Sequence, residues 1–105
     1  MIIDSVPHGR QEDHYPNGQV SRIATFNNGK LNGPLKCYFE NGQLWVEGYY
    51  KDGKKENDWK IWHDNGKLSD EMTFKNDELE GSSRRYDQDG VLMWTEIYKN
   101  GVKVK

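Results

Sequence analysis

The sequence of 105 residues contains one cysteine, three prolines and no apolar run long enough to span a bilayer. A single cysteine cannot form an intramolecular disulfide, so nothing in the sequence suggests an oxidising compartment. The first residues have neither the basic start nor the apolar stretch of a signal peptide. We therefore expect a soluble, cytoplasmic protein.

Hydrophobic residues make up only 33% of the chain, a low value that on its own would be typical of disorder. Aromatic residues, at 12%, point the other way, because each can bury a large area and because they recur in step with the turns described below. A thin sheet with much of its surface in water reconciles the two observations. The formal net charge of −2 argues against a nucleic-acid partner, which would normally need a basic stripe.

Asn-Gly and Asp-Gly dipeptides recur along the chain at a fixed period of 24 residues. A second series with the same period lies 11 residues after the first. Because both residues readily take positive φ, such dipeptides between strands are a strong signal of a β-hairpin. The sequence therefore predicts eight tight turns, at Asn17-Gly18, Asn28-Gly29, Asn41-Gly42, Asp52-Gly53, Asn65-Gly66, Asn76-Asp77, Asp89-Gly90 and Asn100-Gly101.

The repeat phase holds from Ile2 to Gly101, with no linker in between. We predict one domain over residues 1–105, all-β, with about four 24-residue hairpin repeats that follow an N-terminal half repeat. Such repeat sheets usually bind rather than catalyse. The oligomeric state is left open.

One face of the predicted sheet recurs and the other varies. Leu44, Val46, Gly48 and Tyr50 share a face by strand alternation, and apolar residues recur at the equivalent ends of the other outgoing strands. We expect this face to pack. Positions on the other face differ between copies, so a binding surface can lie there; small members such as Ser69 are expected in solvent. The register of the return strands stays open.

These columns resemble the MORN-repeat family, in particular its bacterial variant form. The unit is most complete in Tyr38–Leu44, Gly48–Lys54 and Trp59–Trp62, while Asn57 and Asp77 depart from its glycines. The resemblance covers nearly the whole chain and implies an elongated, curved antiparallel meander of tandem hairpins. It also implies function: eukaryotic relatives are associated with membrane lipids and scaffolding, and bacterial variants with antitoxin or immunity roles.

No catalytic, metal or cofactor site can be defended from the sequence. The segment Gly48–Lys55 fits part of a phosphate-binding loop but has lysine where Ser or Thr must hold magnesium, and it ends in a hairpin. None of His8, His14 and His63 has a second ligand at metal-binding spacing. Cys37 shares its repeat position with an isoleucine, which favours a small buried hydrophobe over a nucleophile.

Two charged features allow more than one interpretation. Lys36, Lys60 and Arg84 recur beside an aromatic column, where they could meet phosphate or a lipid headgroup, or could lay their stems over the rings. Glu47 and Glu71 could instead meet a basic partner and set the association rate.

The leading hypothesis is a non-enzymatic protein-binding module that neutralises a cognate bacterial toxin by direct binding. The alternative is a lipid- or scaffold-binding repeat protein at a membrane surface. If the first holds, large varied side chains should anchor the partner and nearby acids should orient it. The predicted partner-binding residues are Trp45, Glu47, Tyr49, Trp59, Glu71 and Trp94.

Overall fold

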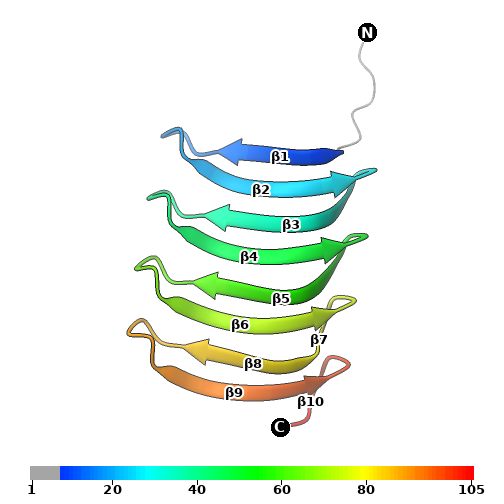
Figure 1. Ribbon diagram of the computed structural model, residues 1–105. Coiled ribbons are helices and arrows are strands. Elements are labelled where there is room, and N and C mark those ends of the chain that lie inside the picture. The colour runs from blue at the N-terminus through cyan, green and yellow to red at the C-terminus, as the bar shows by residue number, and fades with distance from the viewer. Residues whose placement is uncertain (1–7) are drawn as a thin grey trace.

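The computed structural model describes residues 8–105 as a single open sheet without helices (Figure 1). Ile2, where the expected repeat phase begins, lies outside these residues. The strands are β1 (Gly9–His14), β2 (Val20–Asn27), β3 (Lys30–Tyr38), β4 (Leu44–Lys51), β5 (Lys54–Trp62), β6 (Leu68–Lys75), β7 (Glu78–Leu79), β8 (Gly81–Tyr86), β9 (Leu92–Lys99) and β10 (Val102–Lys103).

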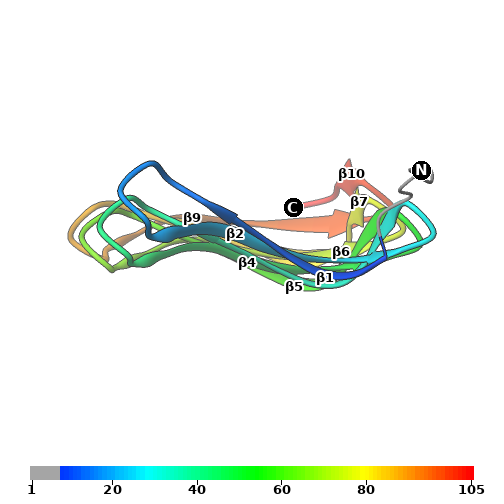
Figure 2. The same cartoon turned by 90° about the horizontal axis from the view of Figure 1, so that it is seen from above.

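Neighbouring strands pair antiparallel in sequence order, and the short β7 pairs with β6 beside the main path. The described residues extend over 55 × 34 × 12 Å, so the sheet is one layer thick. Figure 2 shows it bowed along the strands, with the turns at both ends raised to the same side. The predicted elongated, curved meander of tandem hairpins is confirmed.

The eight predicted turns exist, but they are of two kinds. The turn Asn28-Gly29 joins β2 to β3 through two residues with φ of 51° and 85°, the positive values that the sequence predicted. At Asn17-Gly18 only the glycine has positive φ, and its N–H donates to the carbonyl of Tyr15 at 2.9 Å. This turn therefore spans four residues and ends on the glycine. Each kind recurs in alternation along the sheet.

Side chains stabilise the longer turns and tie them to one another. Oδ1 of Asn17 accepts a hydrogen bond from the N–H of Gln19 at 2.8 Å. In the same way Asn41 and Asn65 each accept one from the N–H of the residue two positions later. The Nδ2 group of Asn17 also donates to the carbonyl of Glu40 in the next turn, at 3.1 Å. These bonds explain why asparagine precedes glycine here even though its φ is ordinary.

One extra residue enters each outgoing strand just after the longer turn. Tyr38 is opposite Leu44 and Cys37 is opposite Val46, so Trp45 has no partner across the strand pair. This β-bulge recurs in every repeat and sets the register that the sequence left open. At the equivalent position Ser69 is only 6% exposed, and its hydroxyl donates to Oδ1 of Asp70 at 2.6 Å. The expectation that Ser69 is in solvent is therefore wrong.

The core is centred on Trp59 and lies on the face that the alternation predicted for Val46, Gly48 and Tyr50. Leu44, which the alternation places on the same face, is opposite Tyr38 beyond the bulge and is not part of the core. The ring of Trp59 lies edge-on to Tyr50 and Phe74, with centroids 5.2 and 6.0 Å away. Its indole N–H donates to the carbonyl of Tyr49 at 3.2 Å, so the buried polar group is satisfied. We call this side of the sheet the core face. It is formed by Ala24, Leu35 and Trp59, with Phe26, Leu31, Cys37, Val46, Tyr50, Met72 and Phe74 packed around them.

Gly48 makes the central packing possible. A Cβ atom at this position would lie 2.3 Å from Cδ2 of Trp59, far inside van der Waals contact. The indole ring therefore lies directly on the backbone of the neighbouring strand. Because a single layer has no second sheet to cover it, the described chain contains no large side chain that is fully enclosed.

Candidate functional site

The six predicted partner-binding residues do not form one site. Trp45, Glu47 and Tyr49 lie on β4, Glu71 on β6 and Trp94 on β9. Trp59 is 5% exposed at the centre of the core face, so its prediction as a binding anchor is wrong. The sequence could not reveal this, because Trp59 shares its repeat position with Leu35 and Ser83 and the register across the strands was unknown.

The two predicted acids lie in a ladder of alternating charges. Reading across the sheet, Lys36 is opposite Glu47, Glu47 is also opposite Lys60, and Glu71 lies between Lys60 and Arg84. Nζ of Lys36 is 3.8 Å from Oε2 of Glu47. Opposite charges on facing residues stabilise a sheet modestly. We call the side that carries this ladder the polar face, and its acids and bases largely offset one another.

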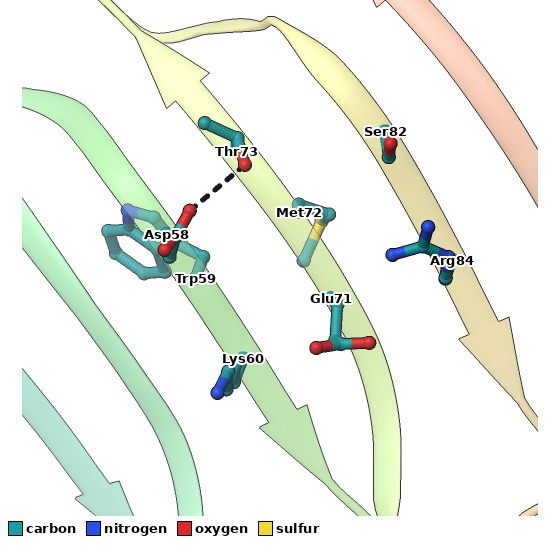
Figure 3. A pocket seen from close by; sticks show the side chains of 8 residues that line it. All are labelled: Asp58, Trp59, Lys60, Glu71, Met72, Thr73, Ser82 and Arg84. Carbon is teal, nitrogen blue, oxygen red and sulfur yellow. Dashed lines mark hydrogen bonds between the residues drawn. The ribbon is translucent and has the colours of Figure 1, made fainter.

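Glu71 has a further partner within the chain. The hydroxyl of Tyr86 donates to its Oε1 at 2.8 Å, and this hydrogen bond raises the pKa of Tyr86 because it holds the phenolic proton. Around Glu71 the polar face is hollowed to about 280 Å³, as Figure 3 shows. In this hollow the hydroxyl of Thr73 donates to Asp58 at 3.0 Å. Lys60 and Arg84 lie on either side of Glu71. The hollow is polar, and its carboxylates already have partners.

A second hollow, of about 240 Å³, lies toward the N-terminal end of the polar face. Tyr49 is 39% exposed and lies directly opposite Pro34, which lines it. Trp45, on the same strand, is 42% exposed and packs against Phe39 with ring centroids 5.3 Å apart. We call Trp45, Tyr49 and this hollow the aromatic site. The hollow is lined by Arg10, Ile23, Thr25, Pro34, Lys36 and Tyr38.

Several residues of the aromatic site were not predicted. The sequence showed Tyr38 as part of a recurring aromatic column, but it gave no signal that Pro34 faces Tyr49. That contact depends on the bulge after the longer turn, which shifts the register by one residue. Once the bulge is known, the repeat spacing places Pro34 opposite Tyr49 and Lys36 opposite Glu47.

Trp94 lies apart from the aromatic site. Strands β5, β6 and β8 separate β9 from β4 (Figure 1). The indole of Trp94 is 43% exposed, and the guanidinium of Arg85 lies 5.7 Å from its ring centroid. It adjoins the exposed side chains of Leu92 and Met93, so any role it has belongs to the C-terminal end of the sheet.

The titratable groups that could carry chemistry have structural surroundings. Burial raises the pKa of the Cys37 thiol, which keeps it protonated and poorly nucleophilic. Nε2 of His63 is 3.1 Å from the carbonyl oxygen of Tyr86, a bond that links two turns. Among residues 8–105 no group of His, Cys, Asp and Glu is arranged to hold a metal ion. The same residues contain no helix of the length and apolar character needed to cross a membrane.

Comparison with known families identifies the repeat unit. A family described as "MORN repeat variant" matches residues 7–28, 31–52 and 55–76, which together are more than half of the chain. Each matched segment takes in a return strand, the longer turn and the next outgoing strand, and the two-residue turns fall at the junctions. No match was found among curated proteins.

Proposed function

The chain belongs to the MORN repeat variant family and is a repeat-containing binding module; from this premise we propose that it binds a protein, and that this partner is a cognate toxin that it neutralises as an antitoxin or immunity protein. The observation that carries the protein partner is the aromatic site. Two large side chains, Trp45 and Tyr49, are about two-fifths exposed on β4, a strand whose Val46 and Tyr50 already pack in the core.

The aromatic site has the features of an interface anchor. Binding energy concentrates in Trp, Tyr and Arg side chains that enter water-excluded pockets. Here Tyr49 lies opposite Pro34, which together with Ile23 lines a hollow, and Trp45 packs against Phe39. Because Phe39 packs against the ring of Trp45 before binding, less side-chain entropy of this residue is lost when a partner covers it.

Glu47 has a supporting role in this proposal. It lies between Trp45 and Tyr49 on β4, and its nearest charge is the exposed Lys36. A basic group on the partner could replace Lys36 without leaving a buried charge unpaired. Rim charges of this kind change the association rate and its salt dependence more than the affinity.

Binding without catalysis is the more economical interpretation of the polar groups. Asp58, Glu47 and Glu71 each have an intramolecular partner, and the one thiol is held protonated. A general acid or base would need a free group with a perturbed pKa beside a substrate pocket. The polar hollow around Glu71 lacks such a group.

The membrane alternative is less well supported by the charges. Binding to anionic lipid needs clustered Lys and Arg side chains. On the polar face, Lys36, Lys60 and Arg84 alternate with Glu47 and Glu71, so the basic column is offset strand by strand. We therefore favour a protein over a lipid surface.

The test is co-expression with the product of the adjacent reading frame, followed by calorimetric titration. Trp45→Ala and Tyr49→Ala should each weaken binding by about 2 kcal/mol or more, while Val102→Ala, an exposed apolar control, should leave it unchanged. Unchanged affinity in both aromatic variants would move the interface away from this site. A neighbour that is not toxic or does not bind would contradict the antitoxin role, and salt-sensitive sedimentation with anionic vesicles would favour the membrane alternative.

A further inference from the structure

The outer edge of β9 is open over most of its length. On its inner side β9 pairs with β8 from Leu92 to Tyr98. On its outer side it pairs with β10 only at Tyr98 and Lys99, and the backbone of Lys105 meets Ile97. Within residues 8–105 no strand covers the outer edge between Leu92 and Glu96, as Figure 1 also shows.

The backbone of this edge is oriented to accept a strand. The N–H of Ile97 donates outward to the carbonyl of Lys105 at 2.9 Å. Because successive residues of a strand alternate in direction, the N–H and C=O of Thr95 also point outward. At the same repeat position Glu47 pairs with Lys60 and Glu71 with Arg84, so the earlier outgoing strands receive the strand that Thr95 lacks.

The side chains at this edge are apolar, and those at the opposite edge of the sheet are not. Val91, Leu92, Met93 and Trp94 form an exposed apolar run, with Leu92 at 48%. The outer edge of β1, which no strand within residues 8–105 covers, instead presents Arg10–His14, all exposed and mostly charged. Charged residues are a common protection of an edge strand against strand addition. The β9 edge lacks that protection between Leu92 and Thr95.

We propose that the outer edge of β9 binds an extended segment of a partner protein as an added antiparallel strand. The interface continues the chain's own antiparallel pairing, in which several facing residues are complementary: Val46 faces Ile61, and Asp70 faces Arg85. The same pairing rule specifies the ligand. It carries a threonine-like residue opposite Thr95 and an apolar β-branched residue opposite Trp94, while Glu96 is already paired with Lys103 of the chain at 3.0 Å.

A second copy of this chain fits the edge poorly. The strand that occupies the required repeat position at the free end of another copy is β1. Asp13 is at the repeat position of Cys37 and Glu12 at that of Lys36. Stacking β1 on β9 would therefore place a carboxylate against Trp94 and another against Thr95. This mismatch favours a partner's segment over head-to-tail assembly, and the proposal is independent of the aromatic site and of the toxin.

The experiment uses the 105-residue chain and a synthetic heptapeptide, Gly-Ser-Lys-Thr-Ile-Tyr-Ser, with blocked ends. Amide hydrogen exchange is followed by NMR during titration to millimolar peptide. Peptide binding should slow exchange of the Thr95 amide by ~tenfold or more, because that N–H gains an acceptor. The same peptide with its threonine nitrogen methylated cannot donate back and should protect Thr95 far less.

A matched pair of variants separates the edge from a general affinity for exposed indoles. Trp94→Ala should weaken peptide binding by about tenfold, whereas Trp45→Ala, which removes an equally exposed indole from a strand paired on both sides, should not change it. Unaltered Thr95 exchange with peptide, equal protection by the methylated peptide, or equal loss in the two variants would overturn the proposal. Thr95 protection that instead rises with protein concentration alone, with a dimer in sedimentation, would show that a second copy takes the edge.

Discussion

Strands β4 and β9 occupy the same position in the repeat and differ in what surrounds them. Leu44 and Val46 on β4 are half-buried, whereas Leu92 and Trp94 on β9 are exposed. The same kind of longer turn precedes both strands, and the same bulge lies at the start of each. The difference is that β4 has a full strand on each side and β9 does not. In a one-layer sheet, burial depends on the flanking strands rather than on the repeat position.

The core residues themselves also differ between the two regions. At the position of Trp59 the last repeat has Ser83, and at the position of Gly48 it has Glu96. The ring-on-backbone contact therefore exists once and is not repeated at the C-terminal end. Stability should consequently be concentrated in β3–β6.

The largest expected effect is at Trp59. Trp59→Ala removes the centre of the core face and should lower the free energy of unfolding by about 3–5 kcal/mol. Trp45→Ala, which removes an exposed indole of the same size, should cost less than about 1 kcal/mol. Urea denaturation of the two variants provides the comparison. Similar midpoints would mean that Trp59 does not organise the core.

The next effect comes from the space that Gly48 leaves for the indole. Gly48→Ala should destabilise the protein by about 1–3 kcal/mol, because its Cβ would collide with Trp59. Combining it with Trp59→Leu, a smaller side chain, should cost less than the sum of the two single changes. Strict additivity in a double-mutant cycle would show that the two residues do not contact each other in this way.

A smaller effect directly compares the two strands. Leu44→Ala should cost about 1–2 kcal/mol, and Leu92→Ala, at the same repeat position, about 0.5 kcal/mol or less. Thermal and urea midpoints of both variants measure the difference. Equal losses would indicate that the flanking strand contributes nothing to burial at this position.

Ser69 tests whether a bulge position can be structural. Ser69→Ala removes a buried hydroxyl that is bonded to Asp70 and should cost about 1 kcal/mol. Thr73→Ala removes an exposed hydroxyl that donates to Asp58 and should stay within about 0.5 kcal/mol. If the two changes had the same effect in urea denaturation, burial at the bulge would be unimportant.

The smallest effect is a pH dependence at the C-terminal end. The hydrogen bond from Lys103, 3.0 Å away, lowers the pKa of Glu96 below its ordinary value. A carboxyl whose pKa is lower when folded stabilises the fold above its unfolded pKa and loses that contribution as the pH falls. The contacts of β10 should therefore loosen below about pH 4. NMR titration should show this in the wild type and not in Lys103→Met.

The sequence predicted the sheet, its eight turns and its packed face because these depend on local rules. Positive φ at Asn28 and alternation along β4 need no knowledge of distant residues. The placements of Ser69 and Pro34 depend on the register that the unpaired residue at each bulge shifts by one. The placement of Trp59 opposite Gly48 depends on a second irregularity, between Glu47 and Tyr49, where β5 has two extra residues. A sequence repeat contains that bulge in every copy, so comparing the copies does not reveal it.

The most direct test of the comparison is native-state amide exchange at one repeat position. Because the N–H of Ile97 points to the outer side of β9, alternation directs the amide of Thr95 to the open edge. By the same repeat position we expect the amides of Glu47 and Glu71 to point to the following strand. In the free protein Glu47 and Glu71 should exchange slowly and Thr95 rapidly, while Glu96, which faces β8, should remain protected. Thr95 protection equal to that of Glu47 in the monomer would contradict the account that flanking strands, and not the repeat position, determine burial and protection.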